Sequence, residues 1–139
     1  MKTNVSWQED VHFTAETGSG FKIEIDGNQI AGARPMELLL AGLGGCTSYD
    51  VVGILKKSRQ DVVSCVAQIE ADRADSVPAV FTEIRVHFVV TGRKLKESVV
   101  ARAVKLSAEE YCSASLMLER GGLDYKCESS LYRIDSYGF

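Results

Sequence analysis

The chain has 139 residues, of which 45% are hydrophobic, and its 16 Lys and Arg against 19 Asp and Glu give a formal net charge of −3. A chain of this length folds as one domain, so we expect a single domain over residues 1–139. The mild acidity leaves no basic stripe for a nucleic acid. The longest apolar run, Met36 to Leu43, is far shorter than the roughly 20 residues of a membrane span, and the N-terminus lacks the apolar core of a secretory signal. We therefore expect a cytoplasmic protein with no nucleic-acid partner and no membrane partner.

The N-terminal third has the pattern of short strands followed by one long helix. Residues 5–7 and 11–15 flank a polar turn, and apolar and charged residues alternate over 21–26. Pro35 stands where a helix begins, because its missing N–H costs nothing in the first turn. From Met36 to about Arg59 the spacing is helical and apolar on nearly every side, which predicts a buried central helix.

The rest of the chain predicts two long strands, a second helix and a closing strand. The strands cover 62–72 and 81–91, and the helix carries apolar residues from Leu95 to Leu106 on one face. Ser107 followed three residues later by Glu110 has the form of a capping box, which predicts that the helix breaks and restarts near Ser107. With a closing strand over 123–135 the order is β-β-β-α-β-β-α-β, an α+β fold.

Three glycines stand together within the long predicted helix: Gly42, Gly44 and Gly45. A glycine in a helix interior costs about 1 kcal/mol relative to alanine. Three of them in four positions predict that another backbone or a substrate approaches the helix closely there.

Four cysteines, at positions 46, 65, 112 and 127, are the candidate residues for metal binding or redox chemistry. None has Cys-x-x-Cys spacing and both histidines lie far from them in the sequence, so we expect neither a metal site nor a cofactor. Cys65 and Cys127 are in phase with apolar residues of their strands and are interpreted as core residues.

Cys46 and Cys112 stand in different surroundings. Cys46 lies between glycines and hydroxyl residues on the long helix, and Cys112 follows the predicted helix break. A thiol at a helix N-terminus has its thiolate stabilised, whereas burial has the opposite effect. The residues alone therefore leave core packing and redox chemistry equally open for both.

One segment and its partner make the chain similar to a known family. The segment is Arg34-Pro35-Met36-Glu37-Leu38-Leu39-Leu40-Ala41-Gly42-Leu43-Gly44-Gly45-Cys46, and its partner is Tyr111-Cys112-Ser113. Together they closely resemble the OsmC/Ohr superfamily of thiol-dependent hydroperoxide reductases, and within it the YhfA-type branch. The resemblance covers essentially the whole chain, including the strand order.

The resemblance implies an intertwined homodimer with long central helices packed together and active sites at the subunit interface. It assigns Cys46 as the peroxidatic thiol, which becomes a sulfenic acid, and Cys112 as the resolving thiol, which converts it to a disulfide. The substrate would be an organic hydroperoxide. An external dithiol, typically a lipoyl group on a partner protein, would reduce the disulfide.

The sequence departs from the family in the pair that activates the peroxidatic thiolate. The family has an arginine near the first hairpin and a glutamate one residue after the helix proline, but here that hairpin has no arginine and Met36 holds the glutamate position. Glu37 and Arg34 are the candidates for supporting roles. Gly44 and Gly45 are the candidates for lining the substrate pocket.

Two other functions remain open. A non-catalytic dimeric module that binds an apolar small molecule at the subunit interface would explain both the missing arginine and the glycine cluster. A purely structural dimer is the third possibility.

Overall fold

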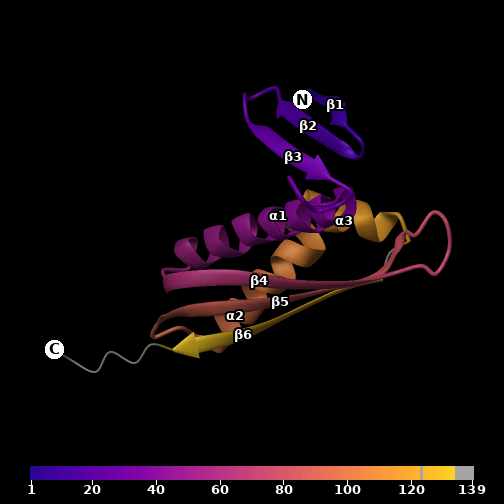
Figure 1. Ribbon diagram of the computed structural model, residues 1–139. Helices are drawn as coiled ribbons and strands as arrows, with labels where there is room; N and C mark the ends of the chain where they lie inside the picture. The colour runs from indigo at the N-terminus through magenta and orange to yellow at the C-terminus, as the bar shows by residue number, and fades with distance from the viewer. Residues whose placement is uncertain (123, 134–139) are drawn as a thin grey trace. The chain divides into compact units, whose positions relative to one another are not determined.

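The computed structural model describes residues 1–122 and 124–133. The chain forms two compact units, Met1–Ala41 and Gly42–Phe139. Its elements follow the predicted order, which confirms the α+β fold (Figure 1). They are β1 Thr3–Glu9, β2 His12–Thr17, β3 Lys22–Asp26, α1 Pro35–Lys57, β4 Asp61–Arg73, β5 Phe81–Arg93, α2 Glu97–Leu106, the π-helical turn η1 Ser107–Tyr111, α3 Ser113–Arg120 and β6 Asp124–Arg133. The single domain over 1–139 stays a prediction. Residues 123, 134 and 135 of the predicted closing strand lie outside the described residues.

The first unit is built on a three-stranded antiparallel sheet in the order β1-β2-β3. Its last strand ends at Asp26, whose buried carboxylate accepts hydrogen bonds from the amides of Asn28 (2.8 Å) and Ala31 (3.1 Å). These amides hold the pKa of Asp26 below its usual range. The carboxylate thereby fixes the turn between β3 and α1.

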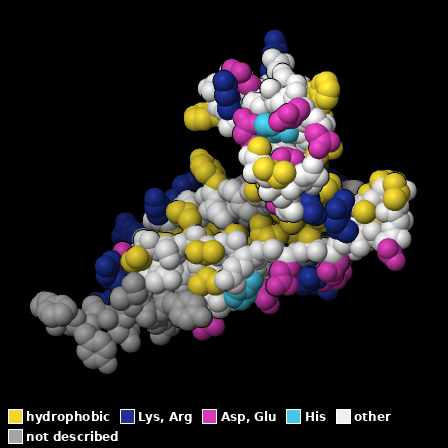
Figure 2. All heavy atoms as spheres, viewed as in Figure 1, with side chains coloured by type: hydrophobic (Ala, Val, Ile, Leu, Met, Phe, Trp, Pro, Cys, Tyr) yellow, Lys and Arg dark blue, Asp and Glu magenta, His cyan; other side chains and the backbone are white. Residues whose placement is uncertain are grey.

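This sheet leaves most of its apolar side chains uncovered. Val5, Trp7 and Phe21 are 59%, 67% and 70% exposed, and of the hydrophobic residues in β1–β3 only Ala15 is buried. Figure 2 shows apolar side chains on the surface of these strands among the charged ones. A sheet with no core of its own needs another surface to cover it.

The second unit has a sheet in the order β4-β5-β6, with β4 and β5 antiparallel and β5 and β6 parallel. The parallel pair requires a crossover connection, which α2, η1 and α3 supply. Alternate residues of β5 are fully buried: Ile84, Val86, Phe88 and Val90. The inner face of this sheet, with the buried side of α1, forms the core.

One row of paired residues crosses this sheet and positions the candidate site. Ile69 on β4 pairs with Val86 on β5, and Val86 pairs with Cys127 on β6. Paired residues point to the same face of a sheet, so Cys127 lies on the buried face with Val86. A β-carbon at Gly44 would lie 2.8 Å from the Ile69 Cδ1, so α1 approaches this row at Gly44. The close approach predicted from the glycine cluster is present at Gly44.

The long helix α1 has one buried side, formed by Leu43, Gly44, Thr47, Val51 and Leu55. Although its longest uninterrupted apolar run is short, α1 as a whole has the length and composition of a membrane span. Central helices of water-soluble proteins commonly share both properties. The absence of a membrane partner stays a prediction.

The α-helix α2 ends at Leu106, as the predicted break near Ser107 requires, but the next α-helix does not start there. Ser107 keeps helical angles (φ −59°, ψ −51°), and its hydroxyl donates a hydrogen bond to the Thr47 carbonyl oxygen at 3.1 Å. The helix continues through η1 and breaks at Cys112, where the backbone is extended (φ −77°, ψ 108°). A side chain engaged with α1 cannot cap a following helix, which explains why no new α-helix starts at Ser107.

Candidate active site

Cys46 lies in the middle of α1 and is half-buried. The next residue, Thr47, is fully buried and its hydroxyl donates to the Leu43 carbonyl oxygen at 3.0 Å. That bond satisfies the only polar group of the Thr47 side chain within the helix. Cys46 is thus presented beside the core, with part of its side chain exposed to solvent.

Cys112 is fully buried at the N-terminus of α3. The Ser115 amide donates to the Cys112 Sγ at 3.4 Å, which makes the thiol the N-cap of the helix. Burial raises the pKa of Cys112, the hydrogen bonds from Ser115 oppose that effect, and the neighbouring Cys46 thiol raises the pKa further. The structure therefore brings Cys46 and Cys112 together from positions 66 residues apart.

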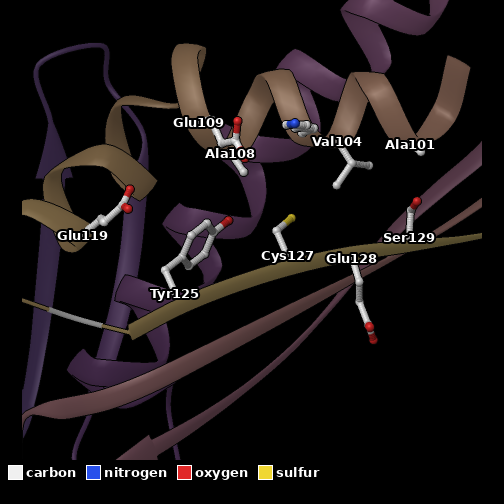
Figure 3. Close-up of a pocket in the computed structure, with 10 residues that line it drawn as sticks. Ala101, Val104, Ala108, Glu109, Glu119, Tyr125, Cys127, Glu128 and Ser129 are labelled. Carbon is white, nitrogen blue, oxygen red and sulfur yellow. The ribbon is translucent and has the colours of Figure 1, made fainter. Parts of the chain in front are cut away.

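Two residues that the sequence interpretation did not select complete this cluster. Tyr125 and Cys127 project from the same face of β6 toward α2 and η1, and both line a cavity of about 510 Å³ (Figure 3). Burial, followed by the charges of Cys127, Cys112 and Cys46, raises the pKa of Tyr125. The Tyr125 hydroxyl is thus next to the Cys127 thiol and within electrostatic range of Cys112 and Cys46.

The Tyr125 hydroxyl oxygen is buried and has no hydrogen-bond partner among the described residues. It is still near enough to the Cys127 thiol to favour its thiolate, although burial outweighs this and raises the pKa of Cys127 to about 11. The only signal in the sequence was the alternation of Tyr125 and Cys127 on one strand face. That alternation is equally typical of core residues.

The match to a protein family decides the identification. The family model described as OsmC-like protein matches residues 26–128. The chain belongs to the OsmC-like family. The resemblance expected from the segment before Cys46 is confirmed.

Relatives and solved structures agree with the OsmC-like assignment. Protein YhfA of Escherichia coli (strain K12) is 50% identical over 121 residues, which are 86% of this chain and 90% of that protein. The crystal structure of a hypothetical protein from Aquifex aeolicus VF5 is 30% identical and has a TM-score of 0.86, covering 95% of this chain and 96% of that one. An organic hydroperoxide resistance protein OsmC from Legionella pneumophila has the same fold at 18% identity, with a TM-score of 0.68 and coverage of 94% and 97%.

The other candidate residues of this OsmC-like chain are divided between the two units. Arg34 and Glu37 belong to the first unit, where Arg34 is exposed and the Glu37 Oε1 accepts a hydrogen bond from the Gln29 Nε2 at 2.6 Å. Gly44 is buried against Ile69. The supporting roles of Arg34 and Glu37 stay predictions.

Gly45 lines a separate groove of about 930 Å³ on the exposed side of α1, together with Tyr49, Val52, Leu106 and Tyr111. More of its lining is apolar than polar, and no atom of the chain lies within 4 Å of a β-carbon placed at Gly45. Among residues 1–122 and 124–133, no three His, Cys, Asp or Glu side chains are grouped to hold a metal ion. The pocket roles of Gly44 and Gly45 stay predictions.

The raised pKa of Cys127 predicts a distinctive pH dependence for its alkylation. Only the thiolate reacts, so with a pKa of about 11 the rate should rise about tenfold per pH unit, close to 100-fold from pH 7 to pH 9. In unfolded protein the thiols titrate near pH 8.5, and the rate should level off above that. Iodoacetamide labelling followed by peptide mass spectrometry measures both. A rate for folded Cys127 that levels off by pH 9 would contradict its burial on the inner face of β6.

Proposed function

We propose that this OsmC-like protein is a cytoplasmic homodimer that reduces organic hydroperoxides with its own thiols. Cys46 acts as the peroxidatic thiol and Cys112 as the resolving thiol. The observation that supports this best is the pairing of a half-buried thiol on α1 with a fully buried thiol at the start of α3. A solvent-accessible thiol can meet the peroxide, and a protected neighbour can trap the product.

The reaction needs two thiols and no cofactor. The Cys46 thiolate attacks the outer oxygen of the O–O bond, the alcohol leaves, and Cys46 becomes a sulfenic acid. The Cys112 sulfur then attacks the Cys46 sulfur, a disulfide forms and water leaves. An external dithiol, of the lipoyl type, reduces the disulfide by thiol–disulfide exchange.

Proteins of the same fold support the choice of substrate. The Legionella pneumophila structure and OhrB of Bacillus subtilis are both described as organic hydroperoxide resistance proteins. The apolar residues of the groove beside Gly45 suit a peroxide with an apolar tail that binds where two copies meet, as the resemblance implies for the active site.

The exposed apolar surfaces support the homodimer. Sheet β1-β2-β3 has almost no core of its own, and the groove on α1 exposes apolar residues, among them Tyr49 and Val52, beside a few charged ones. Surfaces of this kind mark protein interfaces. A second copy would cover both in an isologous contact.

Intact mass tests the proposal directly. Reduced protein treated with one equivalent of cumene hydroperoxide should lose two hydrogens, about 2 Da, by forming a disulfide. The Cys112→Ala variant should instead gain one oxygen, about 16 Da, because its sulfenic acid has no partner. Thiols that remain unreacted in the wild-type protein would refute the proposal.

One observation favours a second candidate function. The groove on α1 could hold an apolar small molecule without chemistry at the thiols. Native mass spectrometry of freshly purified protein would then show a co-purifying ligand. The combination of a bound ligand and inert thiols would select this function over the reductase.

A further inference from the structure

Cys127 is a third thiol beside the candidate active site, and two-thiol chemistry gives it no role. It lies in the Ile69–Val86–Cys127 row of the sheet, on the face that α1 covers at Gly44, two residues before Cys46. Neighbouring strands are about 4.8 Å apart, so two strand spacings, roughly 10 Å, separate the Cα of Cys127 from that of Ile69. Cys127 therefore lies on the sheet face that α1 covers, two strands away from the contact at Gly44.

Cys127 is also near Cys112 and more accessible. Cys112 follows η1, and the Ser115 hydroxyl donates to the carbonyl oxygens of both Ala108 and Cys112 at 3.1 Å. Ala108 lines the same cavity as Cys127 and Tyr125 (Figure 3). Cys112 is fully buried, whereas Cys127 is half-buried and lines that cavity of about 510 Å³. An external dithiol that enters the cavity reaches Cys127 before Cys112.

We propose that Cys127 is a second resolving thiol, which moves the disulfide from Cys46–Cys112 to Cys112–Cys127 and presents it to the reductant in the cavity. This inference rests on the proposed hydroperoxide chemistry at Cys46. The disulfide would then be reduced at Cys127 on β6, while peroxide reacts at Cys46 on α1.

The transfer balances in atoms and electrons. The Cys127 thiolate attacks the Cys112 sulfur, the Cys46–Cys112 bond breaks, and Cys46 leaves with the bonding electron pair as a thiolate. Cys127 loses a proton when it becomes a thiolate, and the Cys46 thiolate that leaves can take up a proton, so the number of protons is unchanged. No net oxidation occurs, and Cys46 is free to attack a second hydroperoxide while the disulfide awaits the external dithiol.

The Tyr125 hydroxyl has a positioning role in this transfer. It is buried without a hydrogen-bond partner among the described residues and lies beside the Cys127 thiol. A hydroxyl that donates to the attacking thiolate lowers the cost of forming it in a buried place. Its own hydrogen-bonding capacity is then satisfied.

Disulfide mapping tests the proposal. Reduced wild-type protein is given one equivalent of cumene hydroperoxide, quenched with acid and digested without reduction. The wild type should yield the Cys112–Cys127 disulfide, and Cys127→Ser should yield only Cys46–Cys112. With a second equivalent and dimedone, a reagent for sulfenic acids, Cys46 should be labelled in the wild type and unlabelled in Cys127→Ser.

Two variants serve as controls. Cys65→Ser removes another half-buried strand cysteine and should behave as wild type. Cys127→Ala should reproduce Cys127→Ser, which separates loss of the thiol from any effect of the serine hydroxyl. A wild type that yields only Cys46–Cys112 would overturn the transfer and leave the reductase intact, whereas a wild type with no disulfide at all would overturn both.

Discussion

Replacing Cys46 by serine is expected to lower the rate of organic hydroperoxide consumption at least about 1,000-fold, because a hydroxyl does not displace oxygen from an O–O bond at neutral pH. The Cys112→Ser variant should react with the first equivalent at nearly the wild-type rate and, when no thiol is added, retain the oxygen as a sulfenic acid on Cys46. In that variant the sulfenic acid on Cys46 has lost the neighbour that the structure places beside it. Peroxide consumption in the presence of dithiothreitol measures turnover, and rapid mixing with one equivalent measures the first reaction.

The two variants together separate the roles of the thiols. Cys65→Ser is the matched control, since Cys65 is a half-buried cysteine of β4 whose raised pKa has burial as its cause. It should keep both rates. If Cys112→Ser lost the first reaction and Cys46→Ser kept it, the assignment of the two roles would be reversed.

The order of the elements was predictable because hydrophobic periodicity carries it. Strand alternation over 62–72 and 81–91 and the helical spacing after Pro35 reflect which side chains face the core, and β4, β5 and α1 lie there. The restart of the helix at Ser107 was not predictable in this way. Its capping-box pattern is a local signal, but the Ser107 hydroxyl donates to the carbonyl oxygen of Thr47, 60 positions away, and so cannot cap a new helix. A tertiary hydrogen bond of that kind has no local signature.

The active site was predictable only in part, for a related reason. Cys46 and Cys112 followed from the family resemblance. Cys127 looked like a core residue because strand alternation reports the face of the sheet and not what lies opposite. Only the pairing of β5 with β6 and the cavity that Tyr125 and Cys127 line show that this face meets α2 and η1 (Figure 3).

The glycines of α1 lead to the second large effect, which concerns the dimer. Gly42, Gly45, Tyr49 and Gly53 recur at steps of three and four residues, which places them along one side of the helix, away from the buried side. No atom of the chain lies within 4 Å of a β-carbon placed at Gly42, Gly45 or Gly53. In an isolated chain these glycines would only weaken the helix, by about 1 kcal/mol each. The absence of side chains at these glycines would allow the same helix of a second copy to pack closely against this side of α1.

Gly45→Leu is therefore expected to disrupt the dimer, since the added side chain would occupy the space that a second helix fills. Sedimentation of the wild type at low micromolar concentration should give twice 15.2 kDa, and the variant should dissociate with a dissociation constant at least about 100-fold higher. Glu97→Leu adds the same side chain at an exposed position of α2 and should leave the dimer unchanged. Gly45→Ala provides the intermediate step: in a monomer it would raise the melting temperature through helix propensity alone, whereas in a dimer the extra methyl group would weaken association. A wild type that sediments as a monomer, or a Gly45→Leu variant that keeps the wild-type dissociation constant, would show that the second helix packs elsewhere.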